Sequence, residues 1–85
     1  MATAETIRDI VAKHGKLPVE VSTLADDGDL YAAGLSSFAS VQLMLAIEEE
    51  FDIEFPENRL NRKTFQTIAA IAEAVDELTR DQQAA

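Results

Sequence analysis

The stretch YAAGLSSFASVQLMLAIEEEF, residues Tyr31–Phe51, decides how this chain folds. From Ser37 onward its apolar residues recur at intervals of three and four, which is the period of an α-helix. Ser36 stands directly before this run, and a serine oxygen there can accept a hydrogen bond from a backbone N–H of the first turn. The pattern therefore predicts a helix from about Ser37 to Glu50, with Ser36 as its N-cap.

A first helix is predicted over residues 3–14, where one apolar stripe recurs at helical spacing. Thr3 can cap its start, and Gly15 can end it in a left-handed conformation. A last helix is predicted to open near Thr64 and to carry one broad apolar face through about Thr79.

The remaining segments are connections. A short helical turn is predicted around residues 57–61, and residues 80–85 are expected to be a frayed tail. The connection over residues 16–36 is long for a compact domain and holds apolar residues that can pin it to the core: Leu17, Val19, Val21, Leu24, Leu30 and Tyr31. We expect an ordered loop with one short turn near residues 29–33. The sum is all-α: one domain over residues 1–85, a small bundle of three main helices plus one short helix.

Composition limits the function classes. A chain of 85 residues with 47 % apolar residues builds one core and is not a disordered tail. It has no cysteine, which excludes disulfides and thiolate metal sites. A formal net charge of −9 should repel nucleic acid and anionic membranes and favour partners with basic surfaces. No apolar run is long enough to span a membrane and the N-terminus has no signal-peptide layout, so the cytoplasm is the expected location. A monomer is also expected, with weak dimers left open.

The helix predicted from Ser37 has more apolar residues than one buried face needs. One side of a helical wheel collects Leu43, Met44, Ile47 and Phe51. An adjoining arc collects Phe38, Val41 and Leu45, flanked by Glu48 and Glu49. We predict that this arc stays exposed as a docking strip with an acidic rim. The alternative is a central helix that is buried almost all round.

Ser37 can be read in two ways. Most serines at a helix start are only caps. Ser36 can perform the capping, however, which frees Ser37, and Gly34 allows the loop to pass close by. A phosphate on Ser37 would lie where first-turn N–H groups and the helix dipole favour an anion. The pattern alone leaves both readings open.

Beyond the pattern, DGDLYAAGLSSFASVQLMLAIEEEFDIEFPE, followed by TFQTIAAIAEAV, resembles the acyl carrier proteins, including their peptidyl and D-alanyl carrier branches. The resemblance covers most of the chain. It implies that Ser37 is the attachment point of 4′-phosphopantetheine, which a separate phosphopantetheinyl transferase moves from coenzyme A. The protein would then hold acyl or aminoacyl groups as thioesters without catalysing a reaction itself.

The resemblance also implies partners. They are the transferase, a loading ligase or synthase, and a downstream acyltransferase in the biosynthesis of fatty acids or secondary metabolites. The family's recognition surface maps onto Phe38, Val41, Gln42, Leu45, Glu48 and Glu49. Reversing the charges of Glu48 and Glu49 is expected to slow loading more than it harms folding.

Two departures from the family's pattern matter. Its common Asp-Ser-Leu motif reads Ser36-Ser37-Phe38 here, and the missing aspartate narrows the expected set of transferases. NRKTF resembles the D-alanyl carriers and places basic residues where fatty-acid carriers are acidic: Arg59, Arg62 and Lys63. Either these residues only balance nearby carboxylates, or the protein is a specialised acyl or aminoacyl carrier.

The sequence disfavours a metal site and an enzyme. DDGD, residues 26–29, has some likeness to a calcium loop but lacks the EF-hand spacing, so no metal site is predicted. A lone histidine, His14, and the absence of cysteine make a nucleophile–base pair hard to assemble. The alternative to a carrier is an unmodified acidic helical adaptor that docks a basic partner through the helix starting at Ser37.

Overall fold

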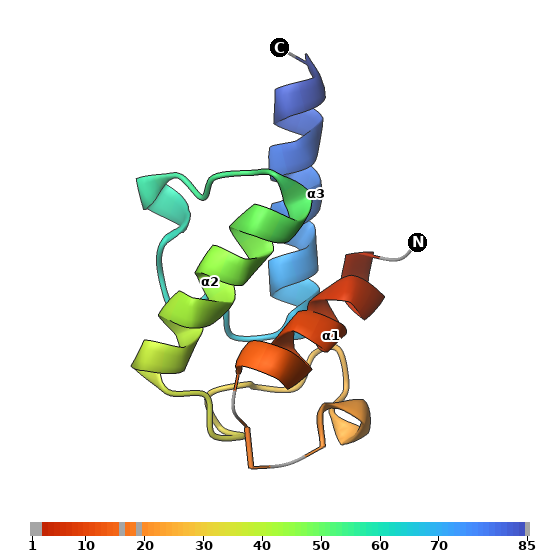
Figure 1. Ribbon diagram of the computed structural model, residues 1–85, viewed down its shortest axis with the longest axis vertical. Helices are drawn as coiled ribbons and strands as arrows, with labels where there is room; N and C mark the ends of the chain where they lie inside the picture. Colours follow the sequence, from red (N-terminus) through yellow and green to blue (C-terminus); the bar gives the residue numbers. More distant parts are fainter. Residues whose placement is uncertain (1–2, 16, 19, 85) are drawn as a thin grey trace.

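The computed structural model describes residues 3–15, 17, 18 and 20–84, and every regular element among them is helical (Figure 1). The elements are α1 (Thr3–His14), η1 (Val21–Thr23), α2 (Ser37–Phe51), η2 (Glu57–Arg59) and α3 (Ile68–Ala84). The predicted all-α bundle, its short helix at η2 and its long ordered loop are confirmed. The 3₁₀ turn η1 was not predicted. Three residues of the predicted loop and tail lie outside the described residues: Lys16, Val19 and Ala85.

The predicted helix α2 is found within one residue of its expected end. The Ser36 side chain accepts a hydrogen bond from the Ala39 N–H at 3.0 Å, so Ser36 is the N-cap as predicted. At the other end Asp52 takes a left-handed conformation with φ 53°, and its N–H donates to the Glu48 carbonyl. Local sequence therefore sets both ends of this helix.

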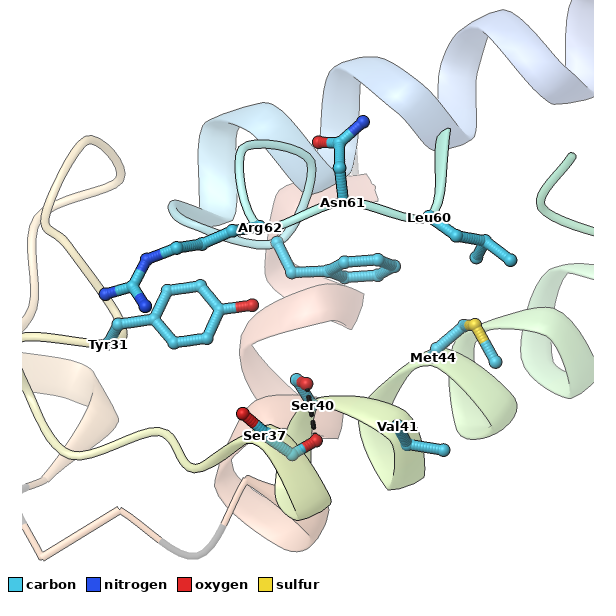
Figure 2. Close-up of a pocket in the computed structure, with 9 residues that line it drawn as sticks. Tyr31, Ser37, Ser40, Val41, Met44, Leu60, Asn61 and Arg62 are labelled. Atoms are coloured by element: carbon cyan, nitrogen blue, oxygen red, sulfur yellow. Dashed lines mark hydrogen bonds between the residues drawn. The ribbon is translucent and has the colours of Figure 1, made fainter. Parts of the chain in front are cut away.

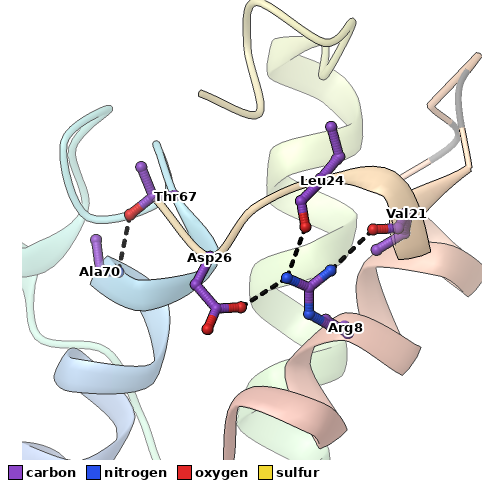
Figure 3. A network of polar contacts seen from close by, with 6 residues as sticks. All are labelled: Arg8, Val21, Leu24, Asp26, Thr67 and Ala70. Atoms are coloured by element: carbon purple, nitrogen blue, oxygen red, sulfur yellow. Dashed lines mark hydrogen bonds and ion pairs between the residues drawn. The ribbon is translucent and has the colours of Figure 1, made fainter. Parts of the chain in front are cut away.

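The start of α3 was predicted too early. Thr64 does not open the helix, because its N–H donates to the Asn61 side chain at 3.0 Å and so belongs to a separate turn. The cap is Thr67, whose hydroxyl accepts from the Ala70 N–H at 2.9 Å (Figure 3). The helix then continues to Ala84, beyond the Thr79 that periodicity indicated.

Two expectations for α1 were also wrong. Thr3 is the first helical residue and not the cap, and its hydroxyl donates to the Asp76 carboxylate on α3 at 3.1 Å. Gly15 is not left-handed. Its N–H donates to the Val11 carbonyl at 2.8 Å, and a Cβ there would come within 2.7 Å of that oxygen. Glycine is therefore required at position 15 because a side chain would clash with the Val11 carbonyl, and not because of its φ angle.

The core lies between the three helices and the long loop. Its fully buried side chains come from every main segment: Ile7, Val11, Leu30, Leu43, Ile47, Ile68, Ile71 and Val75. Leu43 and Ile47 confirm the predicted inner face of α2, and Met44 and Phe51 pack partly buried against the same core. Val21 and Leu30 of the long loop are buried as predicted, which ties the loop to the bundle.

The long loop is also held by polar contacts, which centre on Arg8 of α1 (Figure 3). The guanidinium donates to the carbonyls of Val21 at 2.8 Å and Leu24 at 2.7 Å, and it pairs with the Asp26 carboxylate at 2.6 Å. The Asp26 carbonyl in turn accepts from the Ala69 N–H of α3 at 2.9 Å. Arg8 thus joins the first half of the loop to α1, a role that no sequence pattern indicated.

Replacing Arg8 by methionine is expected to lower the free energy of unfolding by about 2 kcal/mol, because carbonyls held by a charged donor lose their partner. The melting temperature, followed by circular dichroism, should then fall by about 10 °C. Lys13→Met, which removes an exposed cation from the same helix, is the control and should change little. An Arg8→Met protein as stable as the wild type would show that the loop is held without these contacts.

The chain forms a body of 40 × 26 × 19 Å. α2 begins at Ser37 in the lower half of the view in Figure 1, whereas α3 ends at the top of the long axis. Within the described residues, no helix combines the length and apolar character that crossing a membrane requires.

Candidate functional site

The two serines at the head of α2 have different surroundings. The Ser36 oxygen is engaged by the Ala39 N–H, whereas the exposed Ser37 hydroxyl makes no hydrogen bond to a described residue. The Ser37 carbonyl accepts from the Ser40 hydroxyl at 2.7 Å, which fixes the backbone of the first turn (Figure 2). The structure thus separates a capping serine from one whose side chain is free to react.

The loop delivers Ser37 through a tight turn. Gly34 has φ 120°, and a Cβ there would come within 2.7 Å of the Pro18 ring. This confirms that the glycine lets two parts of the loop pass closely. The predicted short turn is also present, since the Ala33 N–H donates to the Asp29 carbonyl at 3.1 Å.

The Asp29 carboxylate organises this turn. It accepts from the Gln66 side chain at 3.2 Å and from the N–H groups of Ala32 at 3.2 Å and Tyr31 at 2.9 Å. These hydrogen bonds, the one from Gln66 first, and the positive charge of Arg62 hold the pKa of Asp29 below its usual value. Asp26 is paired with Arg8, and the described residues contain no cluster of three metal-ligating side chains. Asp26 and Asp29 therefore both hold the loop in place.

An open groove of about 380 Å³ begins at Ser37 and runs between α2 and the segment after η2 (Figure 2). Its walls are mostly apolar or aromatic and consist of Tyr31, Ser37, Ser40, Val41, Met44, Leu60, Asn61, Arg62 and Phe65. The buried Phe65 ring is held in place by an edge-on contact with the Phe55 ring, and the two ring centres lie 5.3 Å apart. Sequence reasoning missed this groove because its two walls are distant in the chain and neither has a motif of its own.

The predicted docking strip on α2 is exposed. The exposed fractions are 69 % for Phe38, 50 % for Val41 and 51 % for Leu45, so the alternative of a helix buried all round is wrong. Gln42 and Glu49 are exposed on the same helix. A further large apolar side chain that the sequence did not single out is Leu60, 47 % exposed on the other wall of the groove.

The two carboxylates at the rim of the strip are not equivalent. Glu48 is half-buried, and its carboxylate accepts the Phe55 N–H at 2.8 Å, which shapes the exit of α2. Reversing its charge would break this bond, so a Glu48 variant is expected to lose stability as well as loading rate. Glu49 is exposed and forms no ion pair within the described chain. Glu49 is therefore the cleaner site for testing the acidic rim.

The three basic residues after η2 are also in different settings. Arg59 pairs with Glu77 of α3. The guanidinium of Arg62 lies over the Tyr31 ring, with Cζ 4.2 Å from its centre, and Lys63 is exposed. Among the described residues none of the three forms an ion pair with Asp52, Glu54 or Glu57, the carboxylates that simple local balancing would use.

Comparison with known proteins supports the carrier reading of this site. The family model described as the phosphopantetheine attachment site matches residues 5–75. The chain belongs to the phosphopantetheine-binding carrier proteins. This protein is a phosphopantetheine carrier. The prediction of a carrier is confirmed over that of an unmodified adaptor.

Three relatives indicate which branch of the carrier family this chain resembles. The chain is 64 % identical to an aminoacyl carrier protein of Agrobacterium fabrum, over 94 % of this chain and 96 % of that protein. It is 33 % identical to a D-alanyl carrier protein of Streptococcus equi subsp. zooepidemicus, over 92 % of this chain and 96 % of that protein. A third relative is a chain in a crystal structure and is 67 % identical to this carrier. That structure is of an engineered Bradyrhizobium japonicum glycine:[carrier protein] ligase complexed with a carrier protein from Agrobacterium tumefaciens and AMP. The match covers 86 % of this carrier and 97 % of that chain, with a TM-score of 0.84.

The residues at the head of α2 suit the prosthetic group. Phosphopantetheine supplies a terminal thiol on which the cargo is held as a thioester. For this the carrier needs an accessible hydroxyl, and Ser37 is exposed with its oxygen unengaged by described residues. First-turn N–H groups favour the negative charge of a phosphodiester there, and the groove beside Ser37 can receive a flexible chain.

Proposed function

We propose that this carrier bears 4′-phosphopantetheine on Ser37 and holds glycine, loaded by a glycine:[carrier protein] ligase. The cargo and the loading enzyme are inferred from the 64 % identical aminoacyl carrier protein and from the 67 % identical chain in the ligase complex. The distant likeness to D-alanyl carriers supports the same branch, a specialised aminoacyl carrier and not a housekeeping fatty-acid carrier.

One observation supports Ser37 over its neighbour. The Ser36 oxygen is bound to the Ala39 N–H and caps α2, whereas the Ser37 side chain is exposed at the mouth of the groove. Only Ser37 can offer its oxygen to a transferase without uncapping the helix. The cap also orders the first turn, whose N–H groups stabilise the phosphodiester after transfer.

The proposed docking surface for the transferase and the ligase is the α2 strip. Its support is the exposure of Phe38, Val41 and Leu45 beside Ser37 on one helix. Gln42 and Glu49 complete this surface, and Glu48 borders it from the half-buried side. An apolar strip next to an acidic rim, on a chain of formal net charge −9, suits basic partner surfaces. A downstream acyltransferase would use the same face.

Intact mass spectrometry after coexpression with a promiscuous phosphopantetheinyl transferase tests the attachment site. The wild type is expected to gain the mass of one phosphopantetheinyl group and Ser37→Ala none. Ser36→Ala is the matched control: it should still be modified, although loss of the cap lowers stability by about 1 kcal/mol. Modification of Ser37→Ala, or its loss only in Ser36→Ala, would contradict the assignment.

The cargo is tested on the purified modified protein. With the ligase, ATP and a mixture of glycine and D-alanine, the carrier should gain the mass of one glycyl group. The added mass should be released by hydroxylamine, which cleaves thioesters. Loading with D-alanine in preference to glycine would refute the proposed cargo and leave the attachment site standing.

A further inference from the structure

Arg62 is a cation without an anionic partner in the described part of the chain. Each of two other arginines has a carboxylate, Asp26 for Arg8 and Glu77 for Arg59. No carboxylate oxygen of a described residue lies within 4.0 Å of the Arg62 side chain, and that side chain donates no hydrogen bond to those residues. Arg80, exposed on α3, also forms no ion pair with a described residue. Arg62 differs from Arg80 in that it lines the groove that begins at Ser37.

The position of Arg62 relates it to Ser37. Both residues line the same groove, Ser37 at the head of α2 and Arg62 on the facing segment (Figure 2). The Tyr31 ring, a third lining residue, carries the guanidinium at 4.2 Å from its centre and so restricts where this flexible side chain can go. The Asp29 carboxylate, whose pKa the Arg62 charge helps to lower, already accepts hydrogen bonds from Gln66, Tyr31 and Ala32.

We propose that Arg62 is a positioning residue for the prosthetic group and pairs with its phosphodiester once Ser37 is modified. This inference rests on the proposed function, because it needs the new anion to be on Ser37. A phosphodiester adds negative charge to a chain that is already strongly acidic, and a nearby cation offsets that repulsion. Guanidinium suits the task, since its planar fork of N–H donors can bind two phosphate oxygens together.

Lys63 provides a matched control. It follows Arg62 directly, is exposed and carries the same charge, but it lines a different, polar groove together with Thr64 and Glu73. If Arg62 acts by its place beside Ser37, neutralising Lys63 should not reproduce the effect of neutralising Arg62.

The experiment compares unmodified and modified forms of the wild type, Arg62→Gln and Lys63→Gln at low salt. The measured quantity is the melting temperature of the modified form minus that of the unmodified form. This difference cancels the lost contact with Tyr31, which affects both forms. It is expected to be lower in Arg62→Gln than in the wild type by about 3 °C or more and unchanged in Lys63→Gln. At high salt the gap between Arg62→Gln and the wild type should shrink, because salt screens the charge of the phosphodiester.

A second readout follows Arg62 directly. Its Nε–Hε signal in nuclear magnetic resonance spectra should move when the wild type is modified. An unmoved signal, or equal differences in melting temperature for the wild type and Arg62→Gln, would overturn the inference. Intact mass separates the two failures: no added phosphopantetheinyl mass on the wild type refutes the proposed function, whereas added mass without an effect of Arg62 refutes only this inference.

Discussion

Leu45→Asp is expected to slow glycine loading of the modified carrier at least about tenfold, while the free energy of unfolding changes by less than about 1 kcal/mol. The reason is position. Leu45 is 51 % exposed in the docking strip, so an aspartate there places a charge in the apolar contact with the ligase and displaces little of the core. The loading rate is measured by mass spectrometry under conditions where ligase is limiting.

Leu60→Asp is the control for introducing a charge at an exposed leucine. Leu60 is 47 % exposed, close to the value for Leu45, but it lies after η2 and outside the strip. It should slow loading less than about threefold. Equal slowing by both variants would show that the ligase reads the whole rim of the groove and not α2 alone.

Leu43→Ala should have the opposite profile. Leu43 lies two positions before Leu45 on the same helix but is completely buried, and truncation leaves a cavity in the core between the helices. The expected loss is about 3 kcal/mol in the free energy of unfolding, or about 15 °C in melting temperature. For a small domain that is a large part of the total stability.

Circular dichroism melts check this prediction, with Val41→Ala on the exposed side of α2 as the control. Val41 is 50 % exposed, and its truncation should cost less than about 1 kcal/mol. At a temperature where Leu43→Ala is still folded, its loading rate should match that of the wild type. Slow loading of the folded variant would mean that the inner face of α2 also affects recognition.

The features that sequence predicted well are those set by neighbouring residues. The spacing of apolar residues located α2 and separated its buried face at Leu43 from its exposed strip at Leu45. The serine directly before this run, Ser36, was correctly predicted as the cap. Family resemblance then distinguished Ser37 from Ser36, which capping rules alone did not.

The features that sequence missed depend on contacts between distant residues. Arg8 binds carbonyls of the loop, and nothing in its neighbourhood within α1 indicates this. The groove needs Tyr31 and Phe65 to come together facing α2, which is decided only when the bundle packs. The start of α3 was misplaced because both Thr64 and Thr67 can cap, and the Asn61 side chain engages Thr64 in a turn of its own.

The opposite placement of Ser37 and the end of α3 along the long axis has a practical use. A carrier attached to a bead or a sensor chip through its C-terminal side would present the reactive face of α2 to the solution. Ligases and transferases could then be captured and compared on one immobilised sample, with the anchor separated from Ser37 along the long axis.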